Sequence, residues 1–169
     1  MSNEPIINKV EQSGLITINL EDFYPEGQRK VIDIREQLVE DVLLREKSFR
    51  EYIAATDWSA YQDSYVAVYC SVDAVIPHWA YMLIGSALAP FAKDMIFGNA
   101  EALENKLFEQ VIDKMDVQAF HDARIIIKGC ADKPVPAAAY FYLTAKLRPI
   151  AKSIMFGEPC STVPVFKRK

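Results

Sequence analysis

The side chains with the most distinctive chemistry in this sequence are its three cysteines. Cys70 follows the apolar run YVAVY, Cys130 follows RIIIKG, and Cys160 lies in the polar segment GEPCSTVP. A thiolate is a nucleophile and a ligand for soft metal ions, and a position between a strand and a helix N-terminus favours it. We therefore take Cys70, Cys130 and Cys160 as candidate thiolate or metal-binding residues. For Cys70 and Cys130 the alternative is that they are small apolar residues that fill gaps in the core. Cys160 is the preferred single functional residue, and its alternative is a plain loop residue after the second long helix.

Three thiolates joined by a fourth ligand would suit zinc or iron, since soft sulfur ligands select these metals. The sequence has no CxxC spacing, which makes the metal signal weak. Four side chains near the cysteines in the sequence are candidate loop partners for such a site: Asp73, Asp132, His78 and Glu158.

Asp73 and Asp132 each lie between an apolar run and a helix pattern. A carboxylate there can cap the helix, because its negative charge favours the positive helix end. If the two loops meet, the pair would instead form an acid/base or metal site. His78 lies at a predicted helix start and could instead be a structural histidine with its hydrogen bonds satisfied within the fold.

The elements that position these residues are arranged as an internal repeat. Residues 44–99 align with 103–158 without a gap, and 17 of the 56 pairs are identical. Unrelated segments would match at roughly 6% of positions. We infer a duplication, and we expect the two copies to pack about an approximate two-fold axis, like a dimer fused into one chain.

Each repeat shows the same pattern of predicted elements. An amphipathic helix at EDVLLREKSFREYIAA or NAEALENKLFEQVIDKM precedes a short strand at YVAVYC or RIIIKGC. A long helix is then predicted from about Pro77 to Phe97 and from about Pro136 to Phe156, kinked at an internal proline and ended by glycine.

Residues outside the repeats predict further strands. LITINLE and KVIDI precede the first repeat, and TVPVFK after the second should be an edge strand because it contains Pro164. We predict an α/β or α+β fold in which helices cover a small mixed sheet and two helix-strand-helix repeats follow in tandem. Residues 1–169 would form a single domain, with an N-terminal extension at 1–39, the duplication, and a C-terminal tail at 159–169.

Composition narrows the classes of partner. A net charge of −4 gives no broad cationic surface, so we expect no nucleic acid partner. Residues 74–92 are uncharged, but they contain prolines and a glycine, and the matching segment carries Lys146 and Arg148. We therefore expect a buried helix and no membrane span. No secretory signal pattern is present, and three cysteines suit a reducing compartment, so we expect a cytoplasmic protein.

The segments YCSVDAVIPHWAYMLI, KGCADKPVPAAAY and SIMFGEPCSTVP resemble a family of uncharacterised bacterial proteins, a domain of unknown function, over nearly the whole chain. The most specific part of the resemblance is GEPCSTVP with the preceding KGC. Genes of that family often lie beside genes for iron-sulfur cluster assembly. The resemblance therefore implies a role near that pathway, with Cys70, Cys130 and Cys160 as its candidate residues.

Three functions remain open at this point. The first, which we favour, is a non-enzymatic accessory protein with a cysteine thiolate site, linked to iron-sulfur or metal handling. The second is a structural or protein-interaction module with buried cysteines, which would form a homodimer or bind a protein partner. The third is a small-molecule enzyme with a site between the two repeats, using Asp73, Asp132, His78 and a thiol. No motif specific to one reaction is present.

Overall fold

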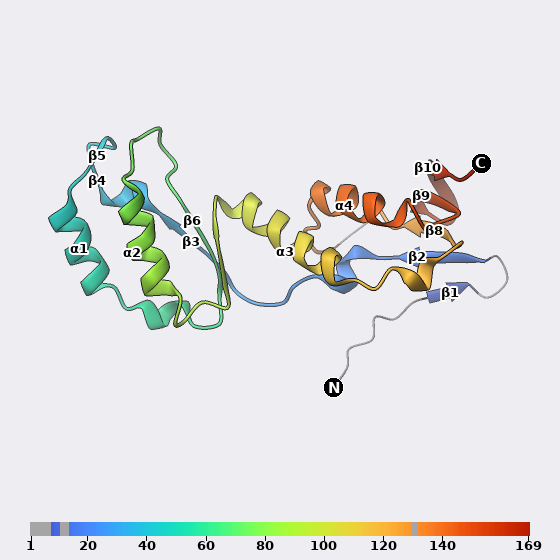
Figure 1. Cartoon of the computed structure of the whole chain (residues 1–169), viewed down its shortest axis with the longest axis horizontal. Helices are drawn as coiled ribbons and strands as arrows, with labels where there is room; N and C mark the ends of the chain where they lie inside the picture. The colour runs from blue at the N-terminus through green and yellow to red at the C-terminus, as the bar shows by residue number, and fades with distance from the viewer. Residues whose placement is uncertain (1–7, 11–13, 130–131) are drawn as a thin grey trace. The chain divides into compact units, whose positions relative to one another are not determined.

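The computed structural model describes residues 8–10, 14–129 and 132–169 (Figure 1). The chain divides into two compact units. Unit 1 consists of Met1–Pro25 and Glu104–Lys169, and unit 2 consists of Glu26–Leu103. Unit 2 is thus inserted between the two segments that form unit 1.

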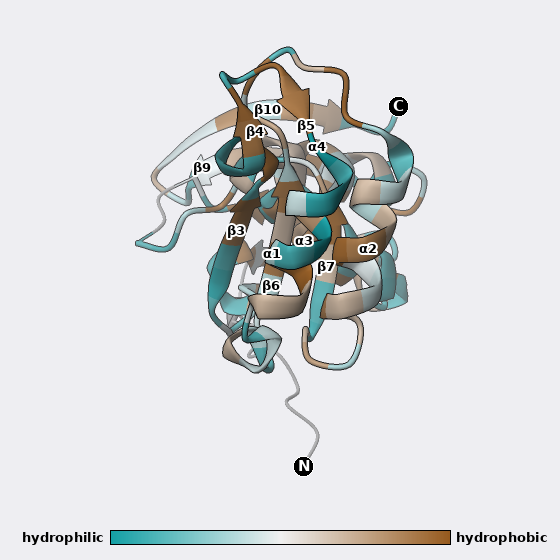
Figure 2. Ribbon diagram, turned by 90° about the vertical axis from the view of Figure 1, so that its left-hand side faces the viewer, coloured by the Kyte–Doolittle hydropathy of each residue, from teal (hydrophilic) through white to brown (hydrophobic). Residues whose placement is uncertain are grey.

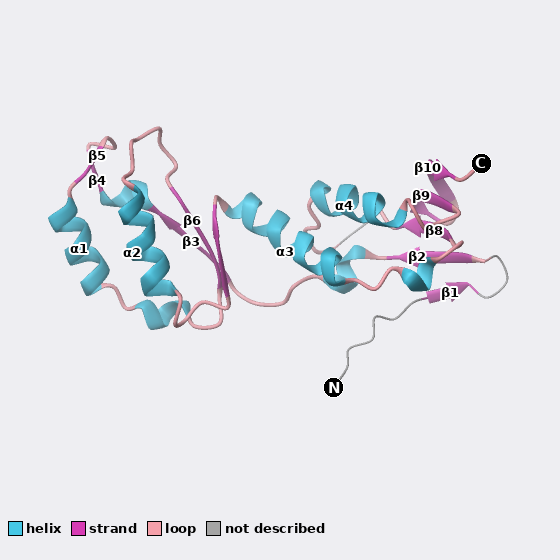
Figure 3. Ribbon diagram, in the orientation of Figure 1, coloured by secondary structure: helices cyan, strands magenta, loops and turns pink. Residues whose placement is uncertain are grey.

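Unit 2 contains a parallel three-stranded sheet in the order β3-β6-β7 and a separate two-stranded sheet, β4-β5. Helices α1 and α2 lie together beside the larger sheet (Figures 1 and 3). Its elements are β3 (Arg29–Asp33), the 3-10 helix η2 (Ile34–Gln37), β4 (Leu38–Val39), β5 (Leu43–Leu44), α1 (Glu46–Ala55), η3 (Trp58–Tyr61), β6 (Tyr65–Tyr69), α2 (His78–Leu88) and β7 (Asp94–Phe97).

Helix α3 (Ala100–Lys114) leads from unit 2 into unit 1. The sheet of unit 1 has the order β1-β2-β8-β9-β10, in which β2, β8 and β9 are parallel and the two outer strands are antiparallel to their neighbours. Its further elements are β1 (Asn8–Val10), β2 (Leu15–Ile18), η1 (Leu20–Phe23), η4 (Gln118–Phe120), β8 (Arg124–Ile127), α4 (Ala137–Leu147), β9 (Ser153–Glu158) and β10 (Ser161–Lys167).

The two units have the same order of elements. The series α1, η3, β6, α2, β7 in unit 2 recurs as α3, η4, β8, α4, β9 in unit 1. The strand registers also agree, since Tyr65 pairs with Asp94, and the equivalent residues of the second repeat, Arg124 and Ser153, pair with each other. This recurrence supports the inferred duplication. The two-fold axis and the single-domain organisation stay predictions.

Each main sheet receives a strand from the N-terminal part of the chain. Strand β2 pairs with β8, and β3 pairs in the same way with β6. Both β2 and β3 are followed by a 3-10 helix whose N-cap side chain, Asn19 or Asp33, accepts a hydrogen bond from the backbone N–H of Glu21 or Arg35. The N-terminal segment therefore supplies one leading strand to each unit.

Each unit has a hydrophobic core of its own. Phe49 of α1 and Phe108 of α3 are 1% and 0% exposed, and each belongs to the core of its unit. The buried faces of the middle strands and second helices complete the cores, at Val66, Val68, Ala80, Ile84 and Leu88 in unit 2 and at Ile125, Ile127, Ala139, Leu143 and Leu147 in unit 1.

The second helix of each repeat is shorter than predicted. Helices α2 and α4 end at Leu88 and Leu147, and the residues that follow form strands β7 and β9. The predicted helix as far as Phe97 or Phe156, kinked at an internal proline, is therefore wrong. Pro90 and Pro149 follow the helix ends, where proline is common because it cannot continue the helix.

The α/β fold class is confirmed. The predicted strands at LITINLE, KVIDI, YVAVYC, RIIIKGC and TVPVFK are present as β2, β3, β6, β8 and β10, and β10 forms one edge of its sheet. Its pairing with β9 shifts between Pro164 and Phe166, as expected for a strand that contains proline. Among the residues described, no helix is both long and apolar enough to cross a membrane.

Candidate functional site

Cys70 lies at the carboxyl end of β6, the middle strand of unit 2. It is half-buried and not part of a disulfide. The next residue, Ser71, donates its backbone N–H to Asp33 Oδ1 at 3.0 Å, and Arg35 N–H donates to the same oxygen at 3.0 Å. Asp33 thus joins the exit of β3 to the loop after β6. Carboxyl ends of parallel strands are the usual place for ligand sites in α/β proteins.

Arg35 places a positive charge near this thiol. Its guanidinium binds Asp41 through two hydrogen bonds, from Nε to Oδ1 at 3.0 Å and from Nη2 to Oδ2 at 2.8 Å. These bonds and the charge of Asp41 raise the pKa of Arg35, and the negative charges of Asp33 and the Cys70 thiolate raise it further. The backbone N–H groups of Arg35 and Ser71 share Asp33 Oδ1 as acceptor, so Arg35 lies near the residue that follows Cys70.

Tyr81 and Asp33 also have shifted pKa values in this part of unit 2. Burial raises the pKa of Tyr81 on α2, and the negative charges of Cys70 and Asp33 raise it further. Burial also raises the pKa of Asp33, but hydrogen bonds from Ser71 and Arg35 and the charge of Arg35 outweigh it, so the pKa is lowered overall. We call Asp33, Arg35, Cys70, Ser71 and Tyr81 the Cys70 cluster.

Unit 1 has a related arrangement at the carboxyl end of β8. The Glu21 carboxylate accepts hydrogen bonds from the backbone N–H of Lys133, at 2.8 Å, and from that of Asp132. The bond from Lys133 is the main cause that lowers the pKa of Glu21. The two units thus share one feature. A carboxylate at the end of the leading strand or just after it, Asp33 or Glu21, accepts hydrogen bonds from the backbone of the loop after the middle strand, β6 or β8. Cys130, the third candidate thiol, lies outside the described residues.

The other predicted site residues are divided between the units. Cys160 is exposed in the turn between β9 and β10, and Glu158 ends β9. Asp73 and His78 belong to unit 2, and His78 begins α2. Neither Asp73 nor Asp132 caps a helix, because the N-caps of α2 and α4 are prolines without a side-chain hydrogen bond.

Metal binding by these residues finds no support within the described ranges. Across residues 8–10, 14–129 and 132–169, no three His, Cys, Asp or Glu side chains lie close enough together to hold a metal ion. Because Cys130 falls outside these ranges, zinc or iron binding stays a prediction.

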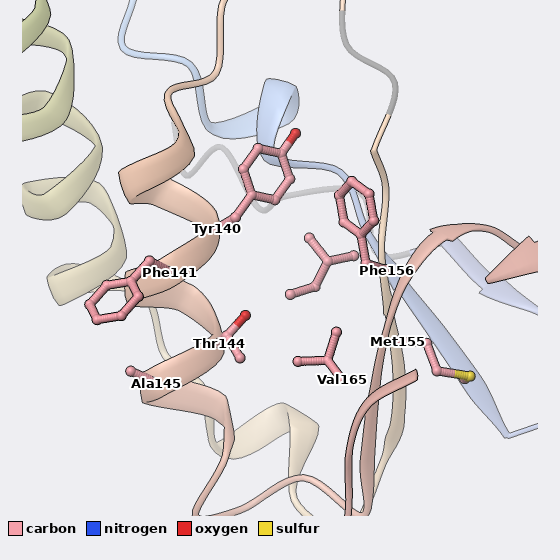
Figure 4. Close-up of a pocket in the computed structure, with 8 residues that line it drawn as sticks. Tyr140, Phe141, Thr144, Ala145, Met155, Phe156 and Val165 are labelled. Atoms are coloured by element: carbon pink, nitrogen blue, oxygen red, sulfur yellow. The ribbon is translucent and has the colours of Figure 1, made fainter. Parts of the chain in front are cut away.

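Unit 1 also contains an apolar cavity that sequence reasoning missed. The α4 cavity, of about 420 Å³, lies between α4 and strands β8, β9 and β10. Tyr140 and Thr144 project into it from α4, and Phe156 and Val165 face them from the strands (Figure 4). The rings of Tyr140 and Phe156 meet edge to face, with centroids 5.7 Å apart.

A second cavity adjoins the first at the carboxyl end of β8. This β8-end cavity, of about 640 Å³, shares Tyr140 and Phe156 with the α4 cavity and also contacts Gly129 and Lys133. A Cβ at Gly129 would lie 2.6 Å from Phe156 Cζ, so only glycine lets the Phe156 ring approach this closely. The same pair of aromatic rings therefore forms a wall of both cavities.

Unit 2 has a smaller counterpart. The α2 cavity, of about 180 Å³, is lined by Val68, Tyr81, Gly85 and Phe97 among others. In the repeat alignment these positions are equivalent to Ile127, Tyr140, Thr144 and Phe156. The Tyr81 and Phe97 rings also meet edge to face, at 4.9 Å.

Asp33, Arg35 and the paired aromatic rings did not emerge as candidates from the sequence. One available signal was a second, shorter repeat, in which LITINLE aligns with RKVIDIR. It would have placed Asn19 and Asp33 at matching strand ends. The other was the identity of Tyr81 with Tyr140 and of Phe97 with Phe156 within the main repeat.

Comparison with known proteins shows one relationship. The model of a family described as protein of unknown function (DUF2480) matches residues 4–168, so the chain belongs to that family. The searches of curated proteins and of solved structures found no match.

Proposed function

We propose that this DUF2480 protein is a non-enzymatic accessory protein whose working group is the thiol of Cys70. The observation that carries the proposal is the Cys70 cluster, in which a half-buried free thiol lies at the carboxyl end of a parallel strand and Asp33 joins the next residue, Ser71, to the segment that carries Arg35. The thiolate is the form of cysteine that acts as nucleophile or metal ligand.

The surroundings of Cys70 support a role beyond packing. A cysteine that only fills a core needs no charged neighbour, whereas Arg35 interacts electrostatically with Cys70. Asp33 also fixes the backbone of the next residue, Ser71, through a hydrogen bond. Cys160 differs from Cys70, because it lies exposed in the turn between β9 and β10.

Thiol reactivity tests the proposal directly. A protein with only Cys70, made by Cys130→Ser and Cys160→Ser, is treated with 5,5′-dithiobis(2-nitrobenzoate), and the release of the coloured thiolate is followed with time. Arg35→Gln should slow the reaction of Cys70 because it removes the positive charge. Asp41→Asn should accelerate it, because it removes the carboxylate that offsets Arg35.

The matched control is a protein with only Cys160, made by Cys70→Ser and Cys130→Ser. Its rate should not respond to Arg35→Gln or Asp41→Asn. Asp41 has a φ of 58°, which asparagine tolerates well, so Asp41→Asn should not strain the turn. If neither substitution changes the rate at Cys70, the thiol is a packing residue and the proposal fails.

Metal or iron-sulfur handling would extend this function. Protein purified without oxygen would be analysed for zinc and iron, in the wild type and in Cys70→Ser, Cys130→Ser and Cys160→Ser. Metal bound in equimolar amount and lost in these variants would assign the thiols to metal handling. Protein without metal would leave Cys70 as a site for thiol chemistry alone.

A protein-interaction module is the second candidate, and exposed apolar side chains favour it. Val75, Met82, Phe97 and Phe141 are 91%, 71%, 75% and 69% exposed. Strands β4 and β5 of unit 2 are also hydrophobic (Figure 2), and Leu43 on β5 is 55% exposed. Light scattering during gel filtration would test this candidate, since a homodimer that Phe97→Ser or Leu43→Ser converts to a monomer would assign the surface to self-association.

A further inference from the structure

We propose that unit 1 binds a small amphiphilic carboxylate, an unbranched acyl chain that ends in a carboxylate group. The chain would occupy the α4 cavity, and the carboxylate would lie in the β8-end cavity beside Lys133. This inference concerns a different unit from Cys70 and does not rest on the proposed thiol function.

The α4 cavity has the size and the lining of a site for an apolar ligand. Its volume of about 420 Å³ falls in the range typical of small-molecule sites. Its walls are almost wholly apolar, with Ile127, Met155 and Val165 from three strands, so an apolar chain gains by leaving water there. Thr144 adds a hydroxyl that points toward the cavity (Figure 4).

A positive charge, that of Lys133, lies in the neighbouring β8-end cavity. The α4 cavity and the β8-end cavity share Tyr140 and Phe156, so the two cavities lie next to one ring pair. The rings are in edge-to-face contact, so a molecule that occupies both cavities must run over their edges or move them apart. Lys133 is the one charged side chain that lines either cavity, within the part of the chain that the structure describes. An apolar chain with a negative end therefore matches the lining.

Lys133 contributes a positive charge at the β8-end cavity, and its ammonium group also lies 5.2 Å from the centre of the Tyr24 ring. Two carboxylates are near in the chain or in space, Glu21 and Asp132, but neither lines a cavity. Glu21 accepts hydrogen bonds from the backbone of the loop, and it also interacts with the charge of Lys128.

Unit 2 lacks the lysine, the threonine and the added strand that line the cavities of unit 1. In the repeat alignment, Ala74 is equivalent to Lys133, and Gly85 is equivalent to Thr144. Val165 belongs to β10, and the sheet of unit 2 has no matching strand among the described residues. The α2 cavity is correspondingly smaller, about 180 Å³. Unit 2 is therefore the internal control for a site in unit 1.

Decanoate is a suitable probe, and decan-1-ol is its uncharged counterpart. Binding is followed by NMR of the methyl groups of Ile127, Met155 and Val165 in the full chain, with Val68 and Ile96 of the α2 cavity as references. Decanoate should shift the first group of signals and leave the reference signals unchanged.

Three substitutions separate the parts of the proposal. Thr144→Phe fills the α4 cavity and should abolish binding of both probes. Gly85→Phe fills the α2 cavity in the matched position and should leave binding unchanged. Lys133→Gln should weaken decanoate binding about fivefold while leaving decan-1-ol unaffected, because a partly exposed ion pair contributes about that much. Circular dichroism checks that each variant is folded.

Several results would overturn the proposal. Unshifted methyl signals with millimolar decanoate would refute the site, as would equal loss of binding in Gly85→Phe. Unchanged decanoate binding in Lys133→Gln would refute the role of the charge. A homodimer that Thr144→Phe dissociates would show that a second copy of the chain covers the cavity instead.

Discussion

Helices α1 and α3, the first α-helices of the two repeats, end with carbonyl groups that lack a partner within the helix. The two units satisfy these carbonyl groups differently. In unit 1, Lys146 Nζ on α4 donates hydrogen bonds to the carbonyl oxygens of Ile112, Asp113 and Met115, at 2.6, 2.8 and 2.9 Å. In unit 2, Trp58 Nε1 donates to Ile53 O at 2.8 Å.

Neither donor has a counterpart in the other unit. The repeat alignment pairs Lys146 with Ala87 and Trp58 with Val117. The backbone arrangement determines which carbonyls need a donor, but it does not determine which residue supplies one. Apolar positions such as Phe49 and Phe108 are retained in both units, whereas these donors at the helix ends have diverged. This division predicts which substitutions should have equal effects in the two units.

The largest equal effect is expected at the two buried phenylalanines. Phe49→Ala and Phe108→Ala should each reduce the free energy of unfolding by about 3–5 kcal/mol, because each leaves a cavity in a closed core. Hydrogen exchange measured by mass spectrometry should show faster exchange in unit 2 for Phe49→Ala and in unit 1 for Phe108→Ala. Equal acceleration in both units for either variant would show that the units unfold together, which would contradict separate cores.

The helix-end donors should have a smaller and unequal effect. Lys146→Met removes three hydrogen bonds from a charged donor and should cost about 2–3 kcal/mol, whereas Trp58→Phe removes one neutral bond and should cost about 1 kcal/mol besides any change in packing. Urea unfolding of the purified variants measures both. Lys146→Arg keeps the charge and donors and is the control. A loss for Lys146→Met no larger than that for Trp58→Phe would contradict this account.

Gly85 offers a stabilising change in unit 2. A Cβ at Gly85 would meet no heavy atom within 4 Å, and glycine within a helix costs about 0.5–1 kcal/mol relative to alanine. Gly85→Ala should therefore raise the free energy of unfolding by about that amount. Gly129→Ala in unit 1 is the contrasting variant and should be destabilising, since its Cβ would lie 2.6 Å from Phe156 Cζ. Thermal unfolding of both variants tests the opposite signs.

The smallest effect concerns pH and the two carboxylates that hold the loops. The pKa values of Asp33 and Glu21 are lowered in the folded protein, so their contribution is complete above their unfolded pKa values of about 4. It is lost as the pH falls from there through the lower folded pKa values. Because both groups are only partly buried and solvent reaches them, only a small loss of stability is expected.

The quantity to measure is the protection of the loop amides from hydrogen exchange, relative to their intrinsic exchange rate at each pH, between about pH 5 and pH 3. The pH dependence of this protection reports the contribution of the carboxylates. Asp33→Asn should remove the pH dependence at Ser71, and Glu21→Gln should remove it at Lys133. Each variant serves as the control for the other unit. An unchanged pH dependence in both variants would show that other groups hold these loops.

Several parts of the fold follow from the sequence because their patterns are local. Strands β6 and β8 are continuous apolar runs, and helices α1 and α3 show apolar residues at helical spacing. Strands β7 and β9 were missed because DMIF and SIMF are too short to distinguish a strand from the end of an apolar helix. Pro90 and Pro149, which precede these strands, suggest kinks within a longer helix when only the sequence is considered. In the structure they follow the ends of α2 and α4.

The candidate site was predictable only in part for a related reason. The position of Cys70 at a strand end follows from the apolar run before it. Its neighbours Asp33 and Arg35 come from a distant part of the sequence, and the pairing of β3 with β6 leaves no local pattern. Tyr81 reaches the cluster through the packing of α2 on the sheet. Such contacts depend on tertiary structure, which periodicity does not encode.

The insertion of unit 2 between the two segments of unit 1 has a consequence for synthesis of the protein. Leu15 on β2 pairs with Arg124 on β8, so β2 leaves the ribosome long before its partner strand exists. At a translation rate of about 5–20 residues per second, the wait is roughly 5–20 s. All of unit 2 is made in that interval. The order of translation therefore lets unit 2 fold first, while an apolar strand of unit 1 remains available to chaperones or to a neighbouring chain.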